Sequence, residues 1–370
     1  MTDARDRADQ PANLTANTTA HPFARPPAAA TPAGASAPAV ARAGLPPTPP
    51  TMTAAAPLLR VRDLQVWLPG RGGTRLHALR GVDLDLEAGD SLALIGESGS
   101  GKTLTALALM GLLPDGAAVS GEIDLQGQSL RSLDEAGWCA VRGRRLAMVF
   151  QEPLTALNPL QRVLAQVMEP IRLHGLAPDR DTARQRALSL LDRVGLDERQ
   201  ARAYPHELSG GQRQRALIAM ALAAEPALLI ADEPTTALDA RLRLQVLDLL
   251  QALVAERGMG LLLISHDLAL TARRVRRLGI LYGGRLMEQG PAAALLAQPR
   301  HPYTQALWAA RPRLGAGRDQ PLHPLPGNVP ALDQLGPGCP FAPRCPLVQP
   351  RCVAQAPVWN GQLACWEVAG

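Results

Sequence analysis

The chain is poor in several residue types, and each shortage excludes a class of protein. Only 3% of its 370 residues are aromatic, and the arginines are dispersed although the formal net charge is +5. A nucleic-acid-binding protein would gather its basic residues on one stripe and interleave aromatic residues, so we expect no nucleic-acid partner. No apolar run reaches the roughly 20 residues that a membrane-spanning helix needs, so the sequence predicts no transmembrane segment.

Cysteine is scarce until the end of the chain. Of five cysteines, Cys139 stands alone, and Cys339, Cys345, Cys352 and Cys365 all follow residue 338. A disulfide framework would require an export signal, and the N-terminus mixes acidic and basic residues without the apolar stretch of such a signal. We therefore expect reduced thiols in a reducing compartment.

Lysine is the rarest of the basic residues. Lys102 is the single lysine among 38 lysines and arginines. Arginine ends in a planar fork, whereas lysine ends in a compact ammonium on a slim stem, so the two are not interchangeable where a point charge must enter a tight backbone cradle. The lysine at position 102 therefore indicates a specific site.

Residues 1–57 are rich in Ala, Pro and Thr. Such a segment cannot bury enough apolar surface to offset the entropy of ordering it, so we expect a disordered tail. A second interpretation is that translation starts at Met52, immediately before the first regular pattern. Both interpretations stay open.

From residue 58 the pattern becomes that of an α/β domain. A helix is expected from Lys102, after a buried strand and a glycine-rich turn, and a block of helices at about 152–225 separates early strands from late ones. We place the main domain at 58–290 and an irregular C-terminal appendage at 291–370, where proline and glycine rise. Strand patterns fall at residues 59–61, 82–86, 91–95, 147–150, 227–231 and 261–265.

The strongest motif matches GxxxxGK[ST] and lies between a predicted strand and a predicted helix, the context that confirms a phosphate-binding loop. Glycines let backbone N–H groups converge on phosphate oxygens, and the helix N-terminus adds partial positive charge. Lys102 would reach the β- and γ-phosphates, and Thr103 would ligate Mg²⁺. The predicted nucleotide-binding residues are Gly96, Glu97, Ser98, Gly99, Ser100, Gly101, Lys102 and Thr103.

A second motif is the acidic pair that follows the buried strand at 227–231. The carboxyl ends of parallel strands share one crevice, so Asp232 and Glu233 are expected beside the phosphate loop. We predict that Asp232 holds Mg²⁺ through its water shell and that Glu233 polarises the attacking water as general base.

Between these motifs stands Leu-Ser-Gly-Gly-Gln at 208–212, and with it the chain resembles the ATP-binding cassette (ABC) ATPases. The resemblance implies a P-loop fold with a mainly parallel sheet, an antiparallel β arm and an inserted helical subdomain. It also implies a head-to-tail dimer, in which each ATP contacts one subunit's phosphate loop and the other subunit's signature helix. The implied signature residues are Ser209, Gly210, Gly211 and Gln212.

The same resemblance gives roles to isolated residues. Gln151 matches the glutamine loop, which senses Mg²⁺ and the attacking water and relays that state to membrane subunits. We therefore count Gln151 as an Mg²⁺ ligand beside Thr103 and Asp232, and as a catalytic residue with Glu233 and His266. Asp239, in Ala-Leu-Asp at 237–239, matches the loop that crosses the dimer interface, and His266 matches the switch histidine on the γ-phosphate. Adenine stacking is less regular, because the aromatic position of the family holds Leu68 here. Trp67 either takes that role from one residue earlier or belongs to the core.

Three segments resemble the oligopeptide, dipeptide and nickel importer ATPases: the glutamine loop at 150–159, His-Pro-Tyr-Thr-Gln-Ala-Leu at 301–307, and the cysteine-containing tail. The resemblance implies an importer ATPase at the cytoplasmic face of the membrane, peripheral to it. Its implied partners are a second cassette, identical or homologous, two integral membrane permease subunits and an extracytoplasmic substrate-binding protein. Peptide is the favoured cargo and nickel the alternative.

The tail cysteines follow the spacing C-x5-C-x6-C-x12-C, which differs from the CxxC pairs of common zinc modules. Four thiolates are enough for a [4Fe–4S] cluster or for zinc, and a metal-free cap with small buried thiols is the third alternative. Some members of the resembling group hold such a cluster.

Two further functions stay open. A soluble cassette ATPase that acts in translation or DNA repair would usually carry two cassettes or a long coiled-coil insertion, and neither is visible here. A regulatory domain that binds ATP without hydrolysing it is disfavoured by the presence of both Glu233 and His266.

Overall fold

The structure is a computed structural model, and the residues that it describes all belong to one compact unit, Ala54–Gly370. The expected N-terminal tail, Met52 included, lies outside the described residues except for residue 57. Residues 152–155 of the expected glutamine loop and Ala237 also lie outside them. The described residues are 57–151, 156–236, 238–310, 325 and 327–368.

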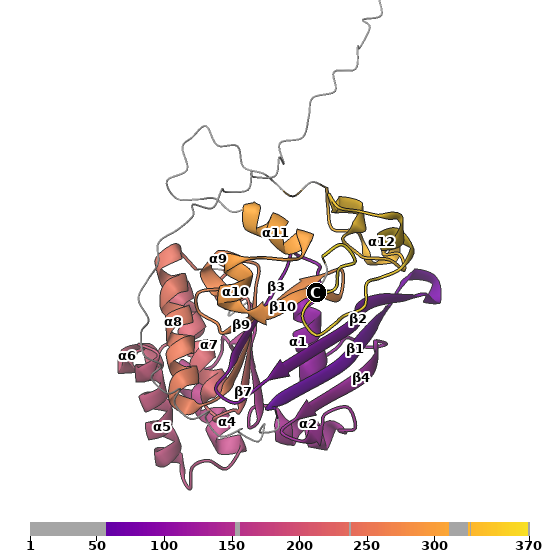
Figure 1. The fold of residues 1–370 in the computed structure, drawn as a ribbon. Coiled ribbons are helices and arrows are strands. Elements are labelled where there is room, and N and C mark those ends of the chain that lie inside the picture. The colour runs from indigo at the N-terminus through magenta and orange to yellow at the C-terminus, as the bar shows by residue number, and fades with distance from the viewer. Residues whose placement is uncertain (1–56, 152–155, 237, 311–324, 326, 369–370) are drawn as a thin grey trace, which may run out of the picture. The chain divides into compact units, whose positions relative to one another are not determined.

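Two sheets form the described unit (Figure 1). The antiparallel sheet has the strand order β2-β1-β4-β5, and the larger sheet has the order β10-β9-β3-β8-β7-β6. In the larger sheet every described pairing is parallel except that of β10 with β9. The strands are β1 Leu59–Pro69, β2 Arg75–Leu86, β3 Ser91–Ile95, β4 Ala118–Leu125, β5 Gln128–Ser129, β6 Leu146–Val149, β7 Leu228–Asp232, β8 Gly260–Ser265, β9 Arg277–Tyr282 and β10 Arg285–Pro291.

Helices cover the large sheet, with α4, α5, α7 and α8 grouped on one side in Figure 1. The sequence places α4 to α7 between β6 and β7, inside the expected helical block. The helices are α1 Lys102–Met110, α2 Glu135–Val141, α4 Val163–Leu173, α5 Arg180–Arg193, α6 Glu198–Ala201, α7 Gly210–Leu222, α8 Ala240–Arg257, α9 Leu268–Thr271, α10 Ala292–Ala297, α11 Pro302–Ala309 and α12 Pro350–Ala354.

The large sheet is buried on both faces, which explains its continuous apolar strands. Successive side chains of a strand point to opposite faces, so β3 contributes to two cores. Ala93 and Ile95 belong to the core formed with α4, α5, α7 and α8. Leu92 and Leu94 belong to the core formed with α1 and the antiparallel sheet. The expected α/β fold with a mainly parallel core and an antiparallel arm is confirmed.

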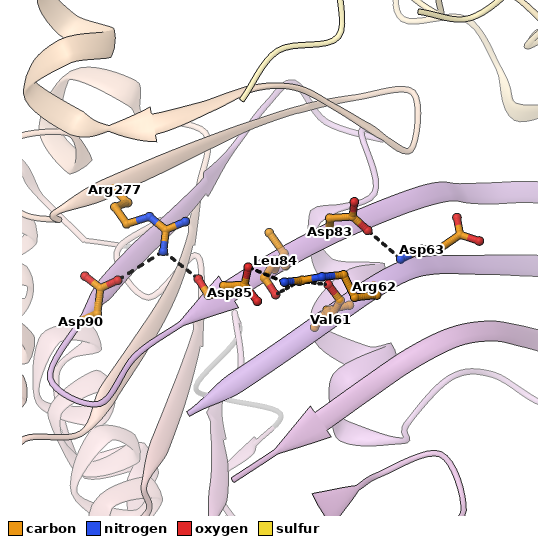
Figure 2. Close-up of polar contacts among 8 residues, drawn as sticks. All are labelled: Val61, Arg62, Asp63, Asp83, Leu84, Asp85, Asp90 and Arg277. Atoms are coloured by element: carbon orange, nitrogen blue, oxygen red, sulfur yellow. Dashed lines mark hydrogen bonds and ion pairs between the residues drawn. The ribbon is translucent and has the colours of Figure 1, made fainter. Parts of the chain in front are cut away.

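Polar contacts connect the antiparallel sheet to the large sheet (Figure 2). Arg277 of β9 donates to the carbonyl oxygen of Asp85 in β2 at 2.9 Å and lies 3.5 Å from the Asp90 carboxylate. Within the arm, Arg62 of β1 pairs with the Asp85 carboxylate at 2.7 Å. A bulge follows at Asp63, where φ is +46° and the backbone N–H donates to Asp83.

The C-terminal region is irregular but anchored in an aromatic cluster, which we define as Tyr282, Tyr303 and Phe341. Tyr282 ends β9, Tyr303 lies in α11, and Phe341 precedes the short 3₁₀ helix η4, Ala342–Arg344. The Tyr282 ring centroid lies 4.6 Å from that of Tyr303 and 5.4 Å from that of Phe341. All three side chains are fully buried. A few aromatic residues thus fix a segment that has little regular structure.

The expected domain limits, 58–290 and 291–370, stay predictions. Strand β10 runs across the expected boundary, because it continues through residue 290 and ends at Pro291. Among the helices that the structure describes, none has the length and apolar character needed to cross a bilayer.

Candidate active site

The phosphate loop joins β3 to α1, and its shape depends on glycine. Gly99 and Gly101 have φ values of +78° and +106°, which side chains with a Cβ rarely adopt. A Cβ at Gly96 would stand 2.2 Å from the carbonyl oxygen of Leu281. The strand therefore turns sharply into a helix whose first N–H groups are available to an anion.

Lys102 lies at the start of α1 with its side chain 6% exposed. Its Nζ donates to the carbonyl oxygens of Gly96 at 2.8 Å and Glu97 at 2.9 Å, inside the curve of the loop. Burial lowers the pKa of this amine, and the charges of Glu233, Asp232 and Glu97 oppose that effect. A planar guanidinium could not make the same hydrogen bonds from this position. This agrees with the prediction that position 102 requires lysine.

Asp232, at the end of β7, lies beside this loop and suits a cation. Its side chain is buried, and its Oδ1 has no hydrogen-bond partner. Burial raises the pKa of this carboxyl group, whereas a hydrogen bond from Thr103 lowers it. A buried carboxylate oxygen without a partner is costly unless a cation satisfies it.

Mg²⁺ fits this pair of residues. It binds through one or two protein oxygens and completes its octahedron with phosphate and water. No three His, Cys, Asp or Glu side chains of the described residues form a metal-holding group, and Mg²⁺ beside a nucleotide does not need one. Thr103 and Asp232 would hold it.

Glu233 is the centre of a polar cluster. Its Oε2 lies 3.1 Å from Nδ1 of His266, which follows β8, and 3.5 Å from Nε2 of Gln151, which follows β6. Thr236 donates to the same oxygen at 2.7 Å. Glu233 also has a φ of +44°, a strained conformation for this residue type that occurs most often at functional sites. The structure therefore brings the three predicted catalytic residues together.

The signature residues lie elsewhere, at the start of α7. Ser209 and Gln212 form a capping box, because Ser209 Oγ accepts from the Gln212 N–H at 3.4 Å and Gln212 Oε1 accepts from the Ser209 N–H at 2.9 Å. Ser209 and Gly210 are exposed, whereas Gly211 packs against Leu242. In the described part of the chain, no hydrogen bond joins residues 208–212 to residues 96–103.

Asp239 and Trp67 also lie outside the Glu233 cluster. Asp239 caps α8, where its Oδ1 accepts from the Leu242 N–H at 2.9 Å. Trp67 of β1 stacks on His77 of β2, with ring centroids 4.6 Å apart. Val66, the residue before Trp67 in β1, is the strand partner of Leu79 in β2. Leu79 in turn packs against Gly101 of the phosphate loop.

The tail cysteines form no disulfide with one another, and Cys352 is buried. Burial, together with the smaller effects of the neighbouring Cys345, Cys352 and Cys365, raises the pKa of Cys339 to about 11. The four thiols are thus neighbours, but no three of the described ligand-type side chains are arranged to hold a metal ion. The described residues give the zinc and iron–sulfur expectations no support.

Three polar residues of the site were missing from the sequence prediction. Thr236 holds Glu233, and the Pro-Thr-Thr run after the acidic pair could have indicated it. Tyr303 and Arg344 contact Glu97 of the phosphate loop from the C-terminal region. Both lie in segments that carry the resemblance to importer ATPases, but nothing in those segments indicates a contact with the phosphate loop.

Comparisons with known proteins agree with this geometry. A family model described as "ABC transporter" matches residues 79–236, and one described as "Oligopeptide/dipeptide transporter, C-terminal region" matches residues 287–352. The dipeptide transport ATP-binding protein DppD of Escherichia coli is 41% identical over 82% of this chain and 93% of its own length. The chain belongs to the ATP-binding proteins of the oligopeptide and dipeptide ABC transporter family.

Other members of this family differ in length. The oligopeptide transport ATP-binding protein OppD of Mycobacterium tuberculosis is 45% identical over 81% of this chain, which spans only 49% of that relative. Among solved structures, the dimeric ATP-binding cassette MJ0796 with ADP and Pi bound is 29% identical. It has a TM-score of 0.58 and covers 63% of this chain and 98% of its own. The ABC ATPase cassette fold is therefore shown.

Proposed function

We propose that this chain is the ATP-hydrolysing subunit of an ABC importer for dipeptides or oligopeptides. The observation that carries the proposal is the Glu233 carboxylate, which His266, Gln151 and Thr236 hold beside the buried ammonium of Lys102. A carboxylate in that position can accept a proton from a water molecule aimed at a γ-phosphate.

The residues of the loop would bind and orient the triphosphate. Its oxygens would accept from the N–H groups at the start of α1 and from Lys102 Nζ, which exchanges its present carbonyl partners for phosphate. Thr103 and Asp232 would hold Mg²⁺, which would supply electrostatic stabilisation of the developing charge. Glu233 accepts the proton of the attacking water, and His266 and Gln151 keep its carboxylate oriented.

Trp67 is the proposed adenine platform. Its neighbour in β1, Val66, pairs with Leu79, which packs against Gly101 of the loop, and the Trp67 indole already stacks on the flat His77 ring. A base could take the exposed side of that stack. Leu68 would then contribute apolar contact without stacking.

The proposed site needs a second cassette. Ser209 and Gly210 are exposed at the start of α7. The Ser209 N–H is taken by Gln212, but the Ser209 hydroxyl accepts from the Gln212 N–H and keeps its own hydrogen, so the hydroxyl and the Gly210 N–H could donate to a γ-phosphate of another subunit. Asp239, also exposed, would lie at the same interface. The proposed partners are an identical or homologous cassette, two permease subunits and an extracytoplasmic binding protein, with this chain peripheral at the cytoplasmic face.

The proposed cargo rests on the C-terminal region and on relatives that are named for oligopeptide and dipeptide transport. Nickel is the alternative cargo. The iron–sulfur and zinc expectations form no part of this proposal, because the described thiols do not form a metal-holding group.

Purification of the chain with its complex from membranes tests the proposal. We expect two integral membrane subunits to copurify, ATP hydrolysis by the complex, and stimulation by a binding protein loaded with peptide. Stimulation by nickel instead would identify the alternative cargo. Active chain that copurifies with no membrane protein would favour the soluble cassette ATPase.

A further inference from the structure

An ion pair connects the C-terminal region to the phosphate loop. Arg344 Nη1 donates to both carboxylate oxygens of Glu97, at 3.0 and 3.1 Å. The Arg344 side chain is 5% exposed and that of Glu97 28% exposed. Because one partner is buried, solvent screens this pair far less than it screens a surface ion pair.

Each polar group of Glu97 has a partner, and two of the three come from beyond residue 300. Its backbone N–H donates to the Tyr303 hydroxyl at 3.0 Å, and its carboxylate accepts from Arg344. Its carbonyl oxygen accepts from Lys102 Nζ at 2.9 Å and from the Ser100 N–H at 3.2 Å. The C-terminal region thus fixes the second residue of the phosphate loop.

Arg344 itself is held firmly. Its Nη1 donates to the Tyr282 hydroxyl at 3.0 Å, and its guanidinium carbon lies 5.7 Å from the centre of that ring. Phe341, three residues earlier, packs against both tyrosines of the aromatic cluster. A side chain held in this way presents its charge at a fixed point, as a positioning residue requires.

The charge on Glu97 is unfavourable where a polyanion must bind. Its influence already reaches the centre of the site, because the Glu97 carboxylate raises the pKa of Lys102. Without Arg344, the Glu97 carboxylate would repel the phosphates and compete with them for Lys102. An arginine that neutralises it removes the repulsion.

We propose that Arg344 is a positioning residue of the nucleotide site: by neutralising Glu97 and fixing the loop backbone, it makes the C-terminal region a determinant of the affinity for phosphate-bearing nucleotides. This inference rests on the proposed function, since it assigns ATP to the phosphate loop. A purely structural alternative is that Arg344 only anchors the C-terminal region. The two alternatives differ in how the loss of affinity caused by an Arg344 substitution depends on the number of phosphates in the nucleotide.

The test uses the full chain and displacement of a fluorescent ATP analogue by ATP, ADP and adenosine in the presence of Mg²⁺. We expect Arg344→Gln to weaken ATP binding on the order of tenfold, the size of a lost charge-assisted interaction. ADP should lose less, and adenosine should bind as before. Added salt should shrink the loss for ATP, because it screens the exposed carboxylate.

Charge neutralisation is tested separately from folding. Glu97→Gln keeps an oxygen for Arg344 but removes the negative charge, so its ATP affinity should be higher than that of the parent chain. Combined with Arg344→Gln, it should recover most of the lost affinity, a coupling that a double-mutant cycle measures. Arg344→Lys keeps the charge with fewer hydrogen bonds and should lie between Arg344→Gln and the parent chain.

Arg351→Gln is the matched control, because Arg351 pairs with Glu367 in the same region at 2.6 Å without contacting the loop. It should leave all three affinities unchanged. Equal losses for ATP, ADP and adenosine in Arg344→Gln, or no recovery in the double variant, would overturn the inference and leave the proposed function intact. A parent chain that binds no ATP would instead overturn the proposed function.

Discussion

The phosphate loop and the signature helix start are both predicted anion-binding sites at a helix N-terminus, yet they are held in opposite ways. The phosphate loop receives its polar partners from distant parts of the chain, Arg344 among them at a separation of 247 residues. Ser209 and Gln212 satisfy each other within three residues and leave an exposed surface. The first region is stabilised by tertiary contacts, whereas the second is a self-contained element.

This difference has a functional meaning under the proposed mechanism. A site that performs chemistry must hold its groups within a few tenths of an ångström, and many anchored contacts achieve that. A surface that must meet and leave a partner subunit in every cycle benefits from local stability and exposure. Changes to the two regions should therefore affect different steps.

The largest expected effect belongs to the chemical step. Glu233→Gln should lower ATP turnover of the complex by roughly 10²- to 10⁴-fold, because it removes the general base. The affinity for the fluorescent ATP analogue should persist, since the amide keeps its hydrogen bonds with Thr236 and His266. Undiminished turnover would contradict the assignment of Glu233.

Lys102→Arg should weaken ATP binding by roughly a hundredfold although the charge is retained. The lysine side chain is buried, and its ammonium fits between two carbonyl oxygens in a space too small for a guanidinium. Equilibrium titration of the isolated chain measures the effect. Affinity within twofold of the parent would show that a point charge is not required there.

Ser209→Ala should have the opposite effect to Lys102→Arg, because it should lower turnover of the complex and leave ATP binding by the isolated chain intact. The isolated chain should bind ATP with unchanged affinity, whereas turnover of the complex should fall roughly tenfold as one hydrogen bond to phosphate is lost. Loss of the cap should also destabilise α7 by about 1 kcal/mol. Ser209→Thr keeps the hydroxyl and serves as control. A drop in ATP affinity of the isolated chain would contradict the separation of the two regions.

The most local expected effect is a pH dependence confined to the C-terminal anchor, by which we mean the aromatic cluster together with His301, whose ring lies against Phe341. Burial lowers the pKa of His301 to about 4 from an ordinary value of 6.5. Between these values the unfolded chain binds a proton that the folded chain does not, so the anchor is fully stable above pH 6.5 and loses up to about 3 kcal/mol as the pH falls to 4. Hydrogen exchange between pH 7 and 5 should show loosening near Tyr303, not in α7.

His301→Gln, which cannot take up that proton, should remove this pH dependence. Equal pH sensitivity in the parent and the variant would show that His301 is not the titrating group.

Much of the fold could be predicted from residue patterns. The run Ser91–Ile95 had to be a fully buried strand because it is apolar at every position but one, and the glycines after it fixed the turn into α1. The N-terminal tail and the glutamine loop at 152–155 lie outside the described residues. The roles of Ser209, Asp239 and Trp67 stay predictions, because each depends on a nucleotide or a partner subunit.

The residue order was enough to predict the chemistry of the site, because the phosphate loop, the acidic pair and the signature are contiguous motifs whose meaning depends on neighbouring residues. Which groups surround these motifs became known only from the folded chain. Tyr303 lies in α11 and Arg344 in η4, and the packing of Tyr282, Tyr303 and Phe341 brings both to Glu97. Contacts between residues so distant in the chain follow from the folded arrangement of whole elements, which no local pattern encodes.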